Sequence, residues 1–233
     1  MSVQTLSKHS DKLREMSMPV WRRILEHPFL RELQQGVLPI ETFRYYIRQD
    51  WLYLQERVGA WTIMAGRCPD PAIRRSLASL GEQLLLIETA SFHAQHATAL
   101  GIDFSHVDWE MNEANWAYTT HQYAAAYAGS TAEGLAALLP CPMVYGFVGH
   151  TLIKGPMPSH PVYADWIDFY GSGRGDLRRS TMIELYDSLM ATADPDTLAR
   201  CERNFLIGSR YEWYFWDAAY RRQTWPGEPN RAD

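Results

Sequence analysis

Three side chains able to do chemistry fall on helical stripes that otherwise carry apolar residues: Cys141, Glu212 and Asp50. Cys141 stands between Pro140 and Pro142, and each proline removes a helical hydrogen bond and presses on the preceding turn. We therefore expect a kink here, which would turn the thiol out of regular packing and leave carbonyl groups open to another partner. The thiolate form of a cysteine is a nucleophile, but no Lys, Arg or His is adjacent in sequence to favour it. Its activation must come from elsewhere in the fold.

Glu212 lies in the middle of an apolar stripe on the last predicted helix. The stripe repeats at spacings of three and four residues and consists of Leu198, Cys201, Phe205, Gly208, Glu212, Phe215 and Ala219. Burial there would raise the pKa of the Glu212 carboxyl group and suit it to proton transfer. The alternative is a structural role, in which a Tyr or an Arg from another helix satisfies the carboxylate.

Asp50 lies on a similar stripe, with Phe43, Tyr46 or Ile47, Tyr53 or Leu54, and Trp61. A buried carboxylate can accept hydrogen bonds from the amino group of a flat heterocycle. It can also pair with an Arg of a neighbouring helix, and for Asp50 taken alone that structural pairing is the slightly favoured interpretation.

The elements that must position these residues are helices, because alternating β-branched runs are missing. Helical spacing predicts helices over about 7–26, 29–35, 39–67, 71–100, 112–128, 130–155, a short stretch after 161, 177–192 and 195–222. Residues 102–110 and 171–175 read as loops, and Ser130 to Glu133 has the form of a capping box. We predict an all-α fold, a single helical catalytic domain over 1–225 with a disordered tail over 226–233.

Composition limits the classes of function. The chain has 233 residues, of which 46% are hydrophobic, and a net charge of -5, which argues against a nucleic-acid binder. Its three cysteines are far apart, so neither a disulfide framework nor a zinc ribbon is indicated. No signal-peptide core and no run of about 18 apolar residues occurs, so we expect a soluble cytoplasmic protein without a membrane span. The aromatic content of 13% can line an interior pocket.

Four blocks, in order along most of the chain, resemble the thiaminase II (TenA) family, which belongs to the same helical superfamily as heme oxygenase and the PQQ-synthesis protein PqqC. The blocks are His27-Pro28-Phe29 with Leu38-Pro39, Tyr45 to Asp50 and Tyr53; Ala136 to Cys141 with Tyr145; His160-Pro161 with Trp166 and Tyr170-Gly171; and Tyr211-Glu212 with Phe215-Trp216. The resemblance implies a bundle of the heme-oxygenase-like type.

The resemblance also implies a reaction, the hydrolysis of 4-amino-5-aminomethyl-2-methylpyrimidine, and of thiamin, to the hydroxymethylpyrimidine. Cys141 would be the nucleophile that adds to the pyrimidine ring. Glu212 would protonate the leaving amine and then activate water, and Asp50 would hold the exocyclic amino group and a ring nitrogen. Pro142 and Met143 depart from the residues common in the family beside the nucleophile.

Five aromatic residues receive roles from the same resemblance. Tyr53 and Phe215 would pack around the ring, and Tyr118 would hydrogen-bond at the ring. Tyr145 would assist near the nucleophile, and Tyr170 would orient the catalytic glutamate. The family implies a homotetramer without a cofactor or a metal, whose partner is a small pyrimidine substrate rather than nucleic acid or membrane.

Other functions on the same bundle remain alternatives. A di-iron oxidase usually uses Glu-x-x-His pairs; the chain has none, and Glu88, His93 and His96 do not share the required spacing. Heme binding has no outstanding histidine near the N-terminus to support it. A PqqC-like oxidase would favour a more basic, His-rich pocket. A non-catalytic ligand carrier or regulator would need neither Cys141 nor Glu212.

Overall fold

The structure, a computed structural model, describes residues 8–84 and 93–227 of the chain. Its helices are α1 (His9–Leu25), α2 (Pro28–Gln35), α3 (Ile40–Arg67), α4 (Pro71–Leu84), α5 (Ala94–Leu100), α6 (Glu113–Ala128), α7 (Thr131–Leu138), α8 (Pro140–Leu152), α9 (Pro161–Gly171), α10 (Asp176–Met190) and α11 (Pro195–Arg221). No strand occurs within the two described ranges, which confirms the all-α prediction. The helix predicted over 71–100 begins as α4 and ends as α5, and positions 85–92 lie outside the described residues.

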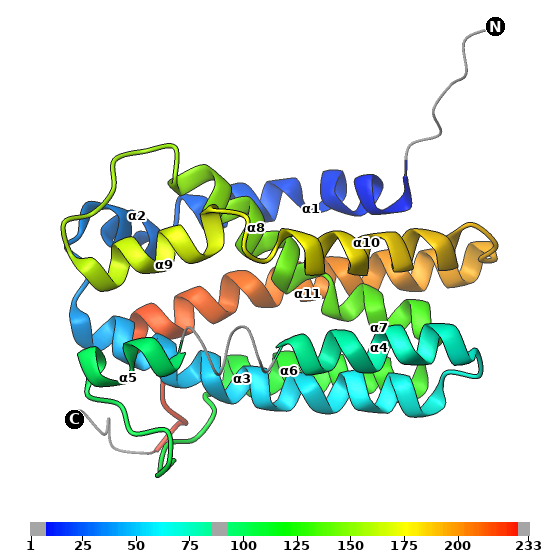
Figure 1. Ribbon diagram of the computed structural model, residues 1–233, viewed down its shortest axis with the longest axis horizontal. Coiled ribbons are helices and arrows are strands. Elements are labelled where there is room, and N and C mark those ends of the chain that lie inside the picture. The colour runs from blue at the N-terminus through cyan, green and yellow to red at the C-terminus, as the bar shows by residue number, and fades with distance from the viewer. Residues whose placement is uncertain (1–7, 85–92, 228–233) are drawn as a thin grey trace, which may run out of the picture.

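The last helix, α11, is the central element of the bundle. It runs between α1 and α10 on one side and α3 and α4 on the other (Figure 1), and it packs against α1, α3, α6, α7 and α8. A stripe of α11 therefore faces several helices at once, which explains why Cys201, Phe205 and Phe215 are all buried. Glu212 shares that stripe and faces the same interior.

The segment predicted as one kinked helix over 130–155 is two helices, α7 and α8, that meet at Leu139. The expected capping box, between Ser130 and Glu133, begins α7. Pro140 is the first residue of α8, and Pro142 lies in its first turn. The first amide groups of a helix have no partner within it, so neither proline removes a hydrogen bond from α8 itself. The predicted interruption lies at Leu139, one residue before Pro140.

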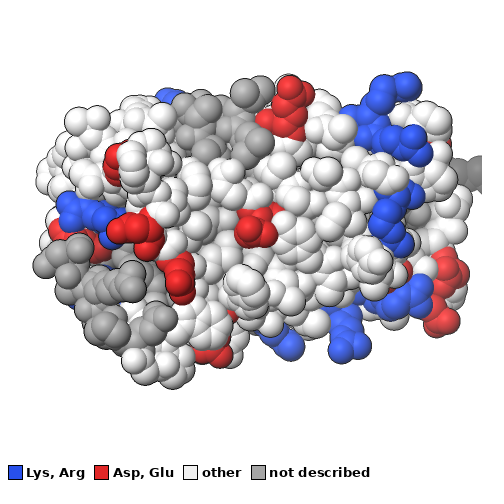
Figure 2. All heavy atoms as spheres, turned by 90° about the horizontal axis from the view of Figure 1, so that it is seen from below, with Lys and Arg blue, Asp and Glu red and all other residues white. Residues whose placement is uncertain are grey.

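The stretch Thr131–Leu152 is long and apolar enough to cross a membrane by length and composition, with a mean hydropathy of 1.4. Within the protein, however, 83% of that window is buried. Such burial is what a core helix of a bundle shows. Elsewhere on the molecule, the face in Figure 2 carries Lys and Arg mainly towards one end and acidic side chains mainly towards the other end and the middle, without a continuous basic surface on its described part.

A buried histidine begins α2. The His27 Nδ1 atom accepts a hydrogen bond from the Phe29 amide at 3.2 Å, and its Nε2 atom lies 3.5 Å from Asp217. Burial lowers the pKa of His27 below its ordinary value of 6.5, although the neighbouring Asp217 opposes the change. The His27 imidazole is therefore protonated more readily in the unfolded chain than in the folded protein. Stability from this site is complete above about pH 6.5 and decreases as the pH falls through the folded-state pKa.

We expect His27→Asn to weaken this acid sensitivity, because Asn can cap the helix without titrating. The measurement is the free energy of unfolding in urea at about pH 7 and about pH 5. The loss between the two should be smaller in the variant than in the natural protein. His106→Asn, in an exposed loop, is the matched control. Equal losses in all three proteins would contradict the assignment to His27.

Candidate active site

The thiol of Cys141 lies in the first turn of α8, with 7% of the residue exposed. It borders a small cavity of about 30 Å³, which is also lined by Tyr145, Phe169, Tyr170 and Arg178. Tyr145 lies one turn further along the same face of α8, as the spacing predicts. A cavity of this size has room for a group about as large as a water molecule. The thiol is therefore buried but next to open space, whereas Cys68 and Cys201 are buried to 2% and 0% exposure.

A close contact between α8 and α11 brings together the helical turns that carry Cys141 and Glu212. A Cβ atom at Gly208 would lie 2.7 Å from the Pro140 Cγ atom, so only glycine lets the two helices approach this far. Pro140 immediately precedes Cys141, and Gly208 lies one helical turn before Glu212. The glycine in the predicted stripe thus positions the two residues that the sequence analysis selected for catalysis.

Glu212 is 2% exposed and accepts a hydrogen bond from the Tyr118 hydroxyl, which lies 2.7 Å from Oε1. Burial, and then the nearby Glu212 charge, raise the pKa of Tyr118 well above its ordinary value, so Tyr118 is the donor in this bond. Tyr118, which the resemblance places at the pyrimidine ring, thus contacts Glu212. Tyr170, which the resemblance implies orients Glu212, also packs its ring 4.8 Å from the Tyr145 ring.

Asp50 is 3% exposed, and its Oδ2 atom lies 2.9 Å from the Nε2 atom of His93. His93, the residue immediately before α5, is itself only 1% exposed. The sequence suggests His93 only as an iron ligand, because nothing in the spacing links it to Asp50. Asp50 also acts electrostatically on Tyr145. The carboxylate therefore lies at the same site as the residues around Cys141.

Tyr53 connects α3 to the thiol. Its hydroxyl oxygen accepts hydrogen bonds from Arg57 Nη1 at 2.6 Å and from Gln122 Nε2 at 2.8 Å. Burial raises the pKa of Tyr53 well above its ordinary value; Arg57 opposes this, and the nearby Cys141 and Glu212 add to it. The hydroxyl thus stays protonated, within electrostatic reach of both predicted catalytic groups.

The second donor group of Arg57 explains one effect of Pro142. Pro142 has no amide hydrogen, so the Leu138 carbonyl lacks its helical donor. Arg57 Nη2 donates to that carbonyl oxygen at 2.6 Å. The prediction that the prolines leave a carbonyl open to another partner is confirmed. Arg57 is not among the predicted site residues, because an arginine in the middle of a helix gives no local sign of burial.

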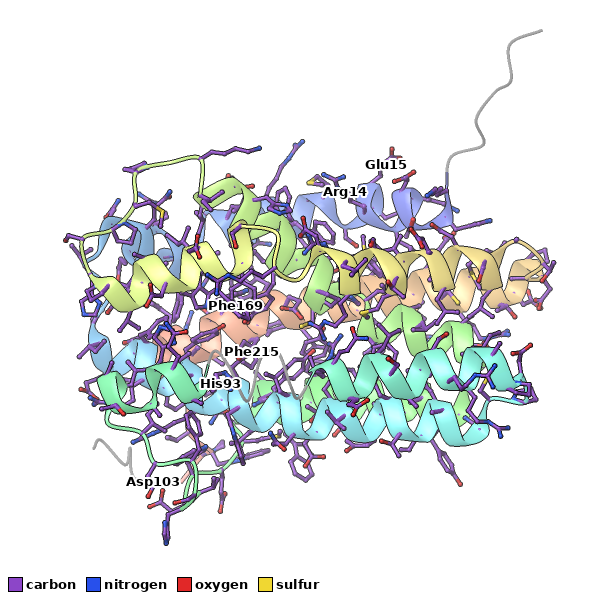
Figure 3. The ribbon with its side chains drawn as sticks, in the orientation of Figure 1. Arg14, Glu15, His93, Asp103, Phe169 and Phe215 are labelled. Carbon is purple, nitrogen blue, oxygen red and sulfur yellow. The ribbon has the colours of Figure 1, made fainter. Side chains whose placement is uncertain are left out.

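Aromatic rings enclose the remaining sides of the site. The Tyr53 ring stacks on Tyr118 with centroids 5.2 Å apart, and Phe215 lies 5.8 Å from Tyr53. The hydroxyl groups of Tyr46 and Tyr145 lie 3.2 Å apart. Figure 3 shows Phe215 of α11, Phe169 of α9 and His93 directed towards the middle of the bundle. All the predicted site residues thus line or adjoin one region, which suits a flat aromatic ligand.

Metal-ligating groups are dispersed in the described part of the chain. Within residues 8–84 and 93–227, no cluster of three or more His, Cys, Asp or Glu has the geometry to hold a metal ion. His93 and His96 contact different carboxylates, Asp50 and Asp165, the latter at 3.3 Å. Glu88, the third residue considered for an iron site, lies outside the described residues.

The chain is similar to known proteins over most of its length. A family model described as TENA/THI-4/PQQC matches residues 15–222. The aminopyrimidine aminohydrolase of Bacillus subtilis (strain 168) is 32% identical over 94% of this chain and 92% of its own length. Among solved structures, a TenA homologue from P. horikoshii OT3 has a TM-score of 0.84 at 27% identity, and the match covers 93% of this chain and 100% of that one. A domain with a heme oxygenase-like fold from Shewanella denitrificans OS217 has a TM-score of 0.72 at 13% identity, and covers 100% of both chains. It shows the fold alone.

Proposed function

The chain belongs to the TENA/THI-4/PQQC family, and from this membership we propose that it is an aminopyrimidine aminohydrolase of the thiaminase II type. Its proposed substrate is 4-amino-5-aminomethyl-2-methylpyrimidine, which it converts to the hydroxymethylpyrimidine, with slower cleavage of thiamin. One observation carries the proposal: a thiol, Cys141, and a buried carboxyl group, Glu212, meet at one aromatic site where α8 approaches α11. The aminopyrimidine aminohydrolase from B. subtilis, similar over nearly the whole chain, supports the same reaction.

The proposed reaction begins with a bond between the Cys141 sulfur and a carbon of the pyrimidine ring. The addition disrupts the aromatic system, and the displaced electron pair helps to expel the amine from the adjacent methylene. Glu212 donates its proton to that amine, which leaves as ammonia. Water then adds to the methylene while Glu212 takes up a proton. The bond to sulfur breaks, the ring becomes aromatic again, and the hydroxymethyl product leaves.

Asp50 fits the role of holding the substrate. Its Oδ2 atom is engaged by His93, and we assign the Oδ1 atom to the exocyclic amino group of the pyrimidine. The His93 imidazole would fix the orientation of the Asp50 carboxylate. A carboxylate that holds two groups of a planar ring needs such a fixed orientation. Tyr53, Tyr145 and Phe215 supply the faces against which the ring would lie.

A purified sample incubated with the aminomethylpyrimidine tests the function directly. We expect ammonia and the hydroxymethylpyrimidine to form in equal amounts, and thiamin to react more slowly. Binding of the aminopyrimidine without turnover would favour a carrier or regulator instead. Oxygen uptake without ammonia release would favour a PqqC-like or di-iron oxidase. The Cys141 and Glu212 pair argues for hydrolysis, because ligand binding alone needs no nucleophile.

We also propose a cytoplasmic homotetramer that works without a cofactor. Three cysteines outside any disulfide, Cys68, Cys141 and Cys201, suit a reducing compartment. Several large apolar side chains are exposed on the single chain and could be covered by other copies: Trp116, Tyr127, Leu177 and Tyr214. Light scattering of the purified protein measures the oligomeric state.

A further inference from the structure

Asp50, the carboxylate assigned to the substrate, is bonded to a histidine from a distant part of the chain. Its Oδ2 atom lies 2.9 Å from His93 Nε2, and the two residues are 3% and 1% exposed. An ionised carboxylate only accepts hydrogen bonds, so Nε2 is the donor in this pair. The imidazole therefore engages one oxygen, and the proposed function assigns the other, Oδ1, to the amino group of the substrate.

Phe104, in the loop that follows α5, packs on the face of this imidazole. The two rings are stacked, with centroids 5.7 Å apart and 26° between their planes. The Phe104 ring also stacks on Trp51 at 5.9 Å, and Trp51 directly follows Asp50 on α3. Asp103, the residue before Phe104, marks the loop in Figure 3. Phe104 thus links the helix that carries the carboxylate with the histidine that contacts it.

The loop that carries Phe104 is itself tied to α3 beside Asp50. Gln49 is 2% exposed, and its side-chain nitrogen donates to the Glu110 carbonyl at 2.7 Å. Its side-chain oxygen accepts from the backbone amide of Asn112 at 3.0 Å. A buried polar group that loses its partner is costly, so the loop cannot move away from this part of α3 without a penalty. The position of Phe104 is therefore fixed relative to Asp50.

We propose that His93 and Phe104 are positioning residues that determine how strongly the site selects a 4-aminopyrimidine over a pyrimidine without that amino group. The inference rests on the proposed function, in which Asp50 receives the amino group. The terminal torsion of an aspartate is broad, so a carboxylate without support turns easily and loses the direction that a strong hydrogen bond needs. His93 prevents this rotation, and Phe104 keeps the imidazole from turning.

Binding of two ligands to the purified full-length protein tests the inference. The first is 4-amino-5-hydroxymethyl-2-methylpyrimidine, and the second is the same compound with hydrogen in place of the 4-amino group. Calorimetry gives both dissociation constants, and their ratio measures selection for the amino group. We expect His93→Leu to lower this ratio about tenfold, through weaker binding of the amino compound. Phe104→Ala should lower it about threefold, because the bond between His93 and Asp50 remains.

His96→Leu is the matched control. His96 is also buried, at 2% exposure, and it also contacts a carboxylate, that of Asp165, at 3.3 Å. The Asp165 side chain is 51% exposed and is not one of the site residues. His96→Leu should therefore lower the free energy of unfolding without changing the ratio of the two dissociation constants. His93→Gln is the conservative variant, and it should restore part of the ratio because Gln still offers a donor to Asp50.

An unchanged ratio in His93→Leu would overturn the inference, since Asp50 would then keep its orientation without the imidazole. An equal fall of the ratio in His96→Leu would also overturn it, because general loosening around α5 would explain both variants. If His93→Leu does not fold, Phe104→Ala carries the test, and an unchanged ratio there refutes the inference. Equal binding of the two ligands by the natural protein would refute the role of Asp50 together with the inference. The hydrolase function is measured separately, by ammonia release, so its failure is distinguishable from these outcomes.

Discussion

Replacing Cys141 with Ala should lower kcat for the aminomethylpyrimidine by at least about 10³-fold, because the reaction loses its covalent route. The side chain is small and borders a cavity, so the substitution should barely disturb packing. The measurement is steady-state ammonia release by the purified variant, together with its affinity for the hydroxymethyl product. We expect that affinity to remain, since Asp50 and the aromatic rings are unchanged.

Cys201→Ala is the matched control for this experiment. Cys201 is fully buried on the same α11 stripe as Glu212, and burial raises the pKa of its thiol to about 12. Cys201→Ala should lower the free energy of unfolding slightly and leave kcat unchanged. If Cys141→Ala retained the full hydrolytic rate, the covalent mechanism would be wrong, whatever the effect of Cys201→Ala.

The second large effect is expected from Glu212→Gln, which should lower kcat by about 10²- to 10⁴-fold, the usual contribution of a general acid and base. The amide oxygen of Gln can still accept the Tyr118 hydroxyl bond, so the shape of the site should be retained. Kinetics would give kcat, and calorimetry would give the dissociation constant of the product. We expect a loss in kcat with little change in binding.

Glu133→Gln is the corresponding control. Glu133 is also buried, at 9% exposure, but it caps α7 and lies 3.2 Å from Arg200, away from the thiol. Its substitution should change the free energy of unfolding only slightly, because Gln can also complete the capping box, and it should leave kcat unchanged. A Glu212→Gln variant with full turnover and reduced affinity would show that the carboxyl group binds substrate without moving protons.

Much of the fold was predictable because helical periodicity and caps are local properties. The ends of α2, α3 and α11 agree closely with the residues expected from proline, glycine and apolar spacing. The junction at Leu139 was harder to place. Two prolines indicate a change of direction, but whether they bend one helix or begin another depends on where the preceding turn ends.

The site was predictable only in part. Charged or reactive residues on apolar stripes identify Cys141, Glu212 and Asp50, because burial of such groups needs a reason. The partners of these residues come from segments that are distant in the sequence. Tyr118 donates a hydrogen bond to Glu212, and the His93 ring contacts Asp50. Spacing along one helix carries no information about such contacts. Arg57 escaped notice for the same reason, since its burial depends on α3 packing against the end of α7.

The carbonyl that Pro142 leaves open has a consequence for how sequences of this kind can diverge. Arg57 supplies the hydrogen bond that an ordinary amide at position 142 would have made within the helix. In a lineage where position 142 regains an amide, selection on position 57 relaxes, and an apolar residue can replace the arginine. Where Pro142 persists, Arg57 should persist with it. Two positions far apart in the chain are thus expected to covary.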